Sequence, residues 1–105
     1  PAFVYRRVPL EDNNKEDLLA HLDGAVDFIA DALSKPGNGV LVHCQQGVSR
    51  SASIVLGYLV REWNHSFEEA MAHVKQRRFI QPGDGFIRQL RSYANLLASS
   101  RGRAD

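Results

Sequence analysis

The feature that most constrains the fold is a polar loop that joins an apolar run directly to a helical run. The apolar run is Gly39–Val42, the loop is His43–Ser51, and the helical run is Ala52–Val60. This order predicts a strand, a turn and the start of a helix. The N–H groups of such a loop and of the helix N-terminus converge on one point, where an anion binds. The sequence therefore predicts that residues 43–51, here called the phosphate loop, hold a phosphate group.

The phosphate loop contains the only cysteine of the chain, Cys44. A helix N-terminus and an arginine both lower the pKa of a nearby thiol, so we expect Cys44 to be ionised and nucleophilic. The planar guanidinium of Arg50 can hold two phosphate oxygens at once. Gly47 lets the loop turn and lets its backbone approach a ligand. The alternative is a buried cysteine that packs as a small apolar residue, and the polar residues after Cys44 argue against it.

The chain before the loop has the pattern of a strand, a helix and a second strand. Phe3–Val8 predicts the first strand, and Asn13 or Asn14 is positioned to cap a helix that begins near residue 15. Pro36–Gly39 ends the helix, and Val40–Val42 predicts the second strand. This order implies a parallel pair with a right-handed crossover. The apolar face of the helix consists of Leu18, Leu22, Val26, Ile29 and Leu33.

The chain after the loop predicts three helices. The first ends around Trp63–His65, and the capping box Ser66–Glu69 starts the second, which runs to about Arg77. Pro82–Gly85 precedes the last helix, and the tail Ser99–Asp105 has a composition typical of disorder. The inward residues of the last helix are Phe86, Leu90, Tyr93 and Leu97. The predicted fold class is α/β, with a parallel-type sheet flanked by helices and the phosphate loop at the carboxyl end of a strand.

The composition is that of an ordinary globular domain and excludes few functions. The chain has 105 residues and a formal net charge of +1, so nothing in it suggests binding to nucleic acid. Its apolar stretches are too short to span a membrane. The three histidines outside the loop, His21, His65 and His73, are scattered and predict no metal site. A lone cysteine fits a reducing compartment, so we expect a cytoplasmic or nuclear location.

The sequence HCQQGVSRS at residues 43–51 resembles the signature of the cysteine-dependent protein phosphatases, and specifically of their dual-specificity branch. The resemblance covers residues 1–98 as the C-terminal part of the family's catalytic domain. Family members usually have further strands and a helix before this point, so the expected fold lacks the N-terminal strands of the family domain. Two strands alone leave an open sheet edge. We therefore expect a trimmed fragment or a homodimer that covers this edge.

The resemblance implies a two-step reaction through a cysteinyl-phosphate intermediate. Cys44 is the expected nucleophile, and Asp12, in the loop between the first strand and its helix, is the expected acid for the leaving oxygen. Ser51 is expected to donate its hydroxyl to the departing thiolate, and His43 to hold the loop in place. The expected phosphate-binding residues are Gln45, Gln46, Gly47, Val48, Ser49 and Arg50. The resemblance implies no cofactor and no metal.

Two of these assignments have simpler alternatives. Asp12 is also suited to capping the helix that follows it. Glu11 and Asp17 are weaker candidates for the acid, because the helix dipole alone explains a carboxylate at residue 17. Ser51 is also an ordinary polar residue for a first helical turn.

Three sequence features bear on the substrate. Gln45 and Gln46 are neutral, whereas phosphoinositide phosphatases with similar loops tend to carry lysines there, so we expect a phosphoprotein substrate. Arg78 lies four residues before Pro82, where relatives carry an arginine that contacts a second phosphate, although cations also favour helix C-termini. Gly83 replaces an asparagine that family members often have after this proline. If that asparagine braces the loop, its absence weakens activity.

Two other functions stay open at this point. One is a phosphate-binding or scaffolding module with little turnover. The other is a phosphatase of phosphoinositides, RNA 5′-phosphates or glycans that uses the same chemistry. The family also suggests a protein kinase as a partner.

Overall fold

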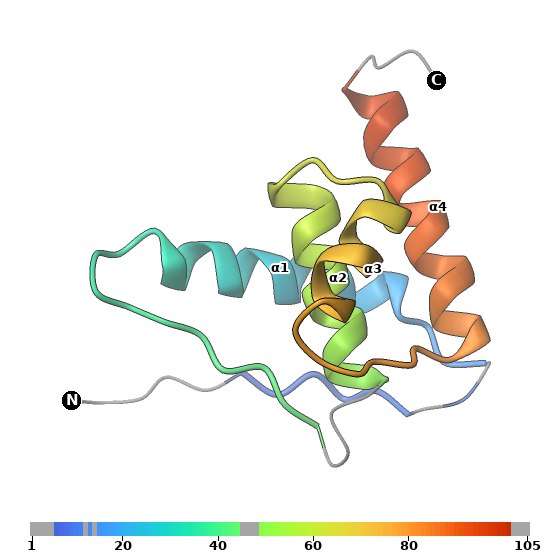
Figure 1. Cartoon of the computed structure of the whole chain (residues 1–105), viewed down its shortest axis with the longest axis horizontal. Helices are drawn as coiled ribbons and strands as arrows, with labels where there is room; N and C mark the ends of the chain where they lie inside the picture. The colour runs from blue at the N-terminus through green and yellow to red at the C-terminus, as the bar shows by residue number, and fades with distance from the viewer. Residues whose placement is uncertain (1–5, 12, 14, 45–48, 102–105) are drawn as a thin grey trace.

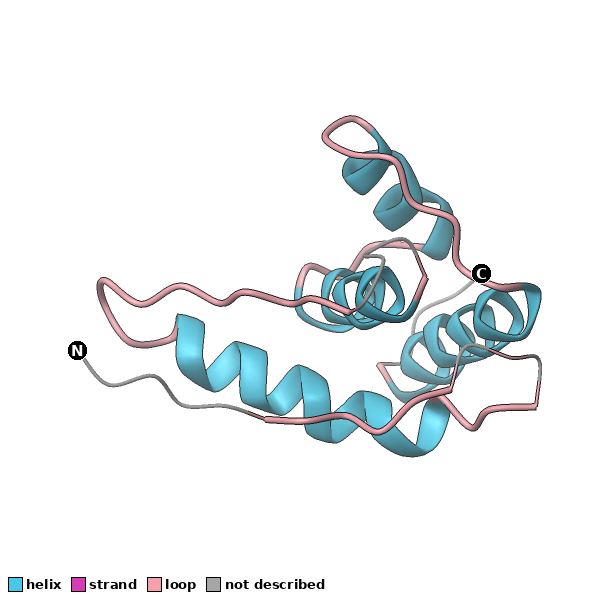
Figure 2. Cartoon of the chain, turned by 90° about the horizontal axis from the view of Figure 1, so that it is seen from below, coloured by secondary structure: helices cyan, strands magenta, loops and turns pink. Residues whose placement is uncertain are grey.

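The computed structural model describes residues 6–11, 13, 15–44 and 49–101. Within this part of the chain, the elements in order are α1 (Leu19–Leu33), α2 (Arg50–Glu62), α3 (Phe67–Lys75) and α4 (Asp84–Ser100). Helix α2 lies in the middle and contacts each of the other three (Figure 1). Residues 6–11 and 37–44 have no helical structure and run along α1 (Figure 2). Together with α1 they line a common groove.

The core lies where α2 meets its neighbours. Its large side chains with less than 2% exposure are Leu18, Leu22, Val26, Leu56, Val60, Phe86 and Leu90. Burying each of these side chains stabilises the fold by roughly 1.5–3 kcal/mol. The predicted inward residues of α1 and α4 are confirmed at most positions, whereas Leu33 is 42% exposed at the end of α1. No helix in the described part of the chain combines the length and the apolar character needed to cross a membrane.

Helix α1 begins at Leu19, later than the predicted start near residue 15. The carboxamide oxygen of Asn13 accepts the N–H of Lys15 at 2.9 Å, which closes a local turn in place of a helix cap. The first turn of α1 finds its partners elsewhere: the N–H of Leu19 donates to Gln89 Oε1 on α4 at 3.0 Å. The N–H groups of this first turn are thus accepted by a distant residue, Gln89, and by a local one, because Asp17 Oδ1 accepts the N–H of Ala20 at 3.1 Å.

The other helix boundaries agree with the sequence more closely. The Ser66 hydroxyl accepts the N–H of Glu69 at 3.0 Å, and the Glu69 carboxylate accepts the N–H of Ser66 at 2.8 Å, so the predicted capping box is confirmed. Helix α3 ends at Lys75, slightly before the predicted end at Arg77. Gly37 has a φ of +80°, which suits a glycine in the turn that follows α1.

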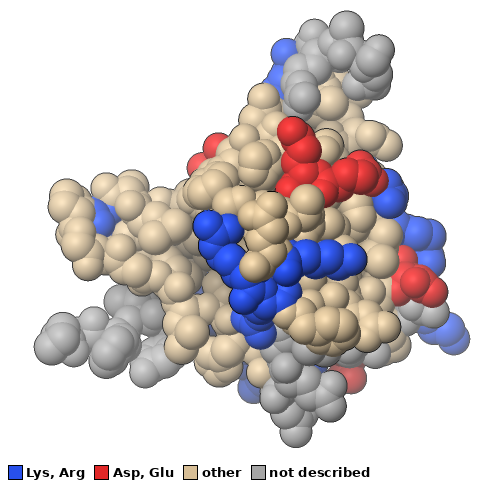
Figure 3. Space-filling view, viewed as in Figure 1, with Lys and Arg blue, Asp and Glu red and all other residues tan. Residues whose placement is uncertain are grey.

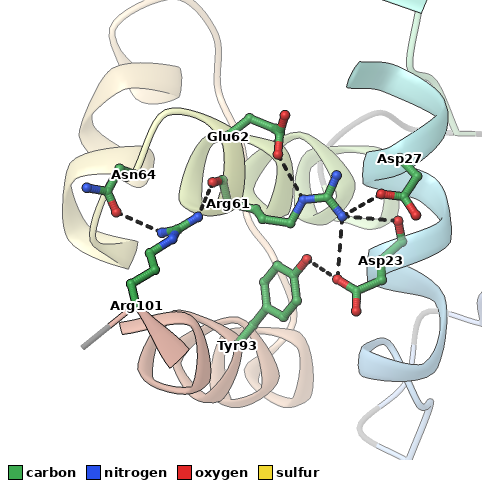
Figure 4. Close-up of polar contacts among 7 residues, drawn as sticks. All are labelled: Asp23, Asp27, Arg61, Glu62, Asn64, Tyr93 and Arg101. Atoms are coloured by element: carbon green, nitrogen blue, oxygen red, sulfur yellow. Dashed lines mark hydrogen bonds and ion pairs between the residues drawn. The ribbon is translucent and has the colours of Figure 1, made fainter. Parts of the chain in front are cut away.

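The predicted disordered tail, Ser99–Asp105, begins too early. Helix α4 continues through Ser100, and the guanidinium of Arg101 donates to Asn64 Oδ1 at 2.7 Å and to the carbonyl of Arg61. These hydrogen bonds tie the end of α4 to the end of α2 (Figure 4). Residues 102–105 lie outside the described part of the chain.

The predicted parallel sheet is wrong: the described residues contain helices and no strand. The segment Val40–Val42 pairs with no other segment there, and the predicted first strand, Phe3–Val8, lies partly outside the described residues. A strand needs a neighbour with which its backbone forms a hydrogen-bonded ladder. An apolar run alone predicts burial but supplies no such neighbour. The homodimer was expected because it would cover an open sheet edge, and without a sheet this reason for it no longer applies.

A polar cluster around Arg61 links α1, α2 and α4 (Figure 4). The Arg61 guanidinium lies 2.8 Å from Asp27, 3.6 Å from Asp23 and 3.0 Å from Glu62. The hydroxyl of Tyr93 donates to Asp23 Oδ1 at 2.6 Å. Burial, reinforced by this hydrogen bond to a carboxylate, raises the pKa of Tyr93 well above its usual value. The cluster thus connects α1 and α4 to the C-terminal end of α2.

Candidate active site

The sulfur of Cys44 lies at the N-terminal end of α2. The backbone N–H of Ser51 donates to Cys44 Sγ at 3.4 Å, and the Ser51 hydroxyl oxygen is also 3.4 Å from this sulfur. The residue that precedes the helix, Ser49, forms no side-chain cap. Because the first N–H groups of a helix have no partner within it, the sulfur acts as the acceptor for one of them.

This position favours the ionised form of the thiol. The N-terminus of a helix carries a partial positive charge, which stabilises an anion placed on it. A thiolate at Cys44 would accept hydrogen bonds from both the N–H and the hydroxyl of Ser51, and hydrogen bonds to charged acceptors are stronger than neutral ones. The local geometry therefore suits a cysteine that acts as a nucleophile.

Arg50 joins the start of α2 to the N-terminal segment. Its Nη1 donates to the carbonyl of Leu10 at 3.5 Å, which is long for a hydrogen bond. Glu11 is exposed and lines the same groove as Cys44. The predicted acid, Asp12, lies outside the described residues, but the segment directly before it runs beside the arginine of the site.

The structure separates the two alternative acids. Asp17 Oδ1 accepts the N–H of Ala20 at 3.1 Å, so its carboxylate serves the first turn of α1. Glu11 lies on the groove wall with Cys44 and Arg50. Glu11 is therefore the better placed of the two described carboxylates.

The groove that contains these groups has a volume of about 1280 Å³. Its walls come from residues 6–11, from α1 and from residues 37–44, and Cys44, Arg50 and Ser51 lie along it. His43 is exposed and lines the groove. Its expected role in holding the loop stays a prediction.

Ser49 is connected to α4 through a contact that side-chain patterns do not reveal. Its hydroxyl accepts the backbone N–H of Gly83 at 3.1 Å, and its carbonyl accepts the hydroxyl of Ser53 at 2.7 Å. The lack of an amide side chain at Gly83 predicts a weaker loop. The backbone of Gly83 forms a contact to the loop instead. Ser53 was missed, although its spacing of four residues from Ser49 places it one helical turn later.

The remaining predicted residues divide into two groups. Gln45, Gln46, Gly47 and Val48 lie outside the described residues. Arg78 is exposed just after α3, close in sequence to the exposed Lys75 and Arg77. Lys and Arg side chains gather at the centre of this face of the molecule (Figure 3). Across the described positions, no group of three or more His, Cys, Asp or Glu side chains is placed to hold a metal ion.

The sequence is similar to those of known proteins. Residues 2–96 match the family model for the dual specificity phosphatase catalytic domain. The Drosophila melanogaster dual specificity protein phosphatase MPK-4 is 47% identical over 90 residues, which are 85% of this chain and 23% of that protein. The chain thus spans less than a quarter of this relative's length.

Solved structures show the same fold. Human DUSP28 superposes with a TM-score of 0.85 at 37% identity, over 90% of this chain and 66% of the other. The human tyrosine phosphatase-like serine/threonine/tyrosine-interacting protein superposes with a TM-score of 0.78 at 34% identity, over 83% of this chain and 58% of the other. With the family model covering nearly all of its length and a cysteine at the helix N-terminus, the chain belongs to the dual-specificity phosphatase family.

Proposed function

We propose that this chain removes phosphate from phosphotyrosine and from phosphoserine or phosphothreonine in proteins, through a cysteinyl-phosphate intermediate. The observation that carries the proposal is the position of Cys44 Sγ at the start of α2, within 3.4 Å of both the N–H and the hydroxyl of Ser51. Arg50 lies on the same groove. A nucleophile, an anion-binding helix end and a guanidinium are the groups that phosphoryl transfer by a thiolate requires.

In the first step, the Cys44 thiolate attacks phosphorus in line with the leaving oxygen. The S–P bond forms as the P–O bond breaks, and the carboxylic acid of Asp12 protonates the departing oxygen. Arg50 and the N–H groups of the phosphate loop hold the equatorial oxygens while their charge redistributes.

In the second step, water attacks the cysteinyl-phosphate. The Asp12 carboxylate accepts a proton from the water, a P–O bond forms and the S–P bond breaks. The leaving group is the Cys44 thiolate, and Ser51 is positioned to donate its hydroxyl to it as charge develops, because the two atoms are already 3.4 Å apart. The products are inorganic phosphate and the free enzyme.

The groove supports a protein substrate. Its volume of about 1280 Å³ exceeds that of typical small-molecule pockets, roughly 300–1,000 Å³. Its walls are mixed, with apolar residues such as Val8 and Val42 beside charged ones such as Arg7 and Lys35. A groove of this size and chemistry suits a phosphorylated peptide segment.

A protein kinase is the partner class that we propose, and Arg78 is the residue that we propose for a second phosphate.

The test compares three substrates at equal concentration: a phosphotyrosine peptide, the same peptide with phosphothreonine, and a soluble phosphoinositide. We expect the unmodified chain to dephosphorylate both peptides and Cys44→Ser to dephosphorylate neither. Faster turnover of the phosphoinositide than of either peptide would instead assign the chain to phosphatases of non-protein substrates. Arg78→Ala is expected to raise KM for a doubly phosphorylated peptide only, with Arg88→Ala, an exposed arginine on α4, as the matched control.

A phosphate-binding module with little turnover is the second candidate. It is favoured by the likeness to the human tyrosine phosphatase-like serine/threonine/tyrosine-interacting protein, whose name refers to interaction. Binding of orthovanadate without turnover of any substrate would establish it. The lone cysteine nucleophile also leads us to propose a reducing location, cytoplasm or nucleus.

A further inference from the structure

We propose that the backbone amide of Gly83 and the hydroxyl of Ser49 form a brace that positions the thiol and the guanidinium of the site. This inference deepens the proposed function and rests on it. It assigns Gly83 and Ser49 as positioning residues that act through Cys44 and Arg50. The brace links the residue before α2 to the residue before α4.

The brace is partly buried, with its acceptor more enclosed than its donor. Ser49 is 4% exposed, and Pro82, which precedes the donor, is also buried. A hydrogen bond that is partly removed from water costs more to lose than one at the surface. The 3.1 Å contact between Gly83 and Ser49 is therefore well placed to hold the end of the phosphate loop.

The carbonyl of Ser49 is held as firmly as its hydroxyl. It accepts the N–H of Ser53 at 2.9 Å and the Ser53 hydroxyl at 2.7 Å, and Ser53 is 0% exposed. Ser49 is thus fixed from α2 on one side and from α4 on the other. Ser49 directly precedes Arg50, and Ser51 follows in the same helical turn, so the orientation of Ser49 bears on the direction of the guanidinium and of the N–H that meets Cys44.

The contribution of Gly83 comes from its amide and not from its flexibility. Its φ of −64° and ψ of 156° are ordinary extended values that other residues adopt. Its own carbonyl accepts the N–H of Ile87 at 2.9 Å, within α4. Any residue that retains a backbone N–H can therefore donate to Ser49, and proline alone cannot.

A proline at residue 83 therefore removes only the backbone N–H that donates to Ser49. Gly83→Pro deletes the donor, while its ring fixes φ at about −65°, which matches the observed −64°. Gly83→Ala keeps the donor and is the matched control. Ser49→Ala removes the acceptor, and the double variant Ser49→Ala/Gly83→Pro removes both.

Two measurements follow each variant: turnover of para-nitrophenyl phosphate, and the pH dependence of Cys44 alkylation by iodoacetamide. We expect Gly83→Pro and Ser49→Ala each to lower kcat roughly 3–10-fold and to move the midpoint of alkylation to higher pH. The double variant is expected to be no worse than either single one. Gly83→Ala is expected to behave as the unmodified chain in both measurements.

The proposal is overturned if folded Ser49→Ala and Gly83→Pro leave the alkylation profile and kcat unchanged, or if their effects multiply in the double variant. Thermal melting identifies the folded variants. If Gly83→Pro does not fold, Ser49→Ala compared with the unmodified chain decides the question by the same criterion. Failure of the proposed function is distinguishable, because the alkylation profile reports on the brace even where no substrate is turned over.

Discussion

Replacing Gly57 with alanine tests how closely α1 and α2 pack. A Cβ atom at Gly57 would lie 2.6 Å from Leu22 Cδ2. Carbon atoms in contact prefer about 3.5–4.0 Å, so the new methyl group overlaps the leucine by about 1 Å. Leu22 is 0% exposed, so its side chain cannot move into solvent to relieve the overlap.

Two opposing terms set the magnitude. Alanine in place of glycine inside a helix stabilises by about 1 kcal/mol, and overpacking a core destabilises by about 1–3 kcal/mol. The expected net change is a loss of about 0–2 kcal/mol in the free energy of unfolding. A loss of 1 kcal/mol lowers the Tm of a domain of this size by about 4–8 °C.

Gly24 provides the matched control, because it lies in α1 and its neighbour can move. A Cβ atom there would meet only the guanidinium end of Arg6, with Nη2 at 2.6 Å. Arg6 is exposed and flexible, so the side chain swings away at little cost. Gly24→Ala is therefore expected to raise the free energy of unfolding by about 0.5–1 kcal/mol.

Urea denaturation followed by far-UV circular dichroism measures both changes. A further variant, Leu22→Val, removes the atom that Gly57→Ala would overlap. In that background we expect Gly57→Ala to be neutral or stabilising. If Gly57→Ala stabilises the unmodified chain as much as Gly24→Ala does, the close packing of α1 and α2 at this glycine is refuted.

Three further predictions concern the interactions outside the groove. Burial raises the pKa of Tyr93, so the folded state keeps the phenolic proton at a pH where the unfolded chain loses it. The contribution of Tyr93 to the free energy of unfolding is therefore complete below about pH 10 and falls as the pH rises above it. Urea titrations at several pH values should show a smaller fall in Tyr93→Phe, and an equal fall would contradict the role of its hydrogen bond to Asp23. Arg61→Met should cost about 1–2 kcal/mol at low salt and less in 1 M salt, because its carboxylate partners, such as Asp27, are exposed; a loss independent of salt would count against the ion pairs. Ser66→Ala should cost about 1 kcal/mol through loss of the cap of α3, and an unchanged urea midpoint would show that the capping box contributes nothing.

The sequence predicts the helices well because their signals are local. The capping box at Ser66 and the apolar spacing of Leu22 and Val26 depend only on nearby residues, and the structure confirms them. The start of α1 was missed because one N–H of its first turn pairs with Gln89, seventy residues away, and because the local acceptor is Asp17 and not Asn13 or Asn14. The sheet was predicted wrongly because the apolar run Val40–Val42 indicates burial, whereas a strand also needs a neighbouring strand.

The site shows the same division. Cys44 and Arg50 stand out in the sequence because side chains carry their chemistry. The contact from Gly83 could not be predicted, because a backbone amide is present at every residue except proline and only the fold decides where it points. The predicted loss of activity at Gly83 was based only on its missing side chain.

The most direct test of the account is hydrolysis of para-nitrophenyl phosphate in the presence of EDTA, by the unmodified chain, Cys44→Ser and Asp12→Asn. We expect turnover that EDTA does not affect, that is abolished in Cys44→Ser and that is strongly reduced in Asp12→Asn. Turnover that persists in Cys44→Ser, or that EDTA abolishes, would contradict a mechanism based on the thiolate at the start of α2.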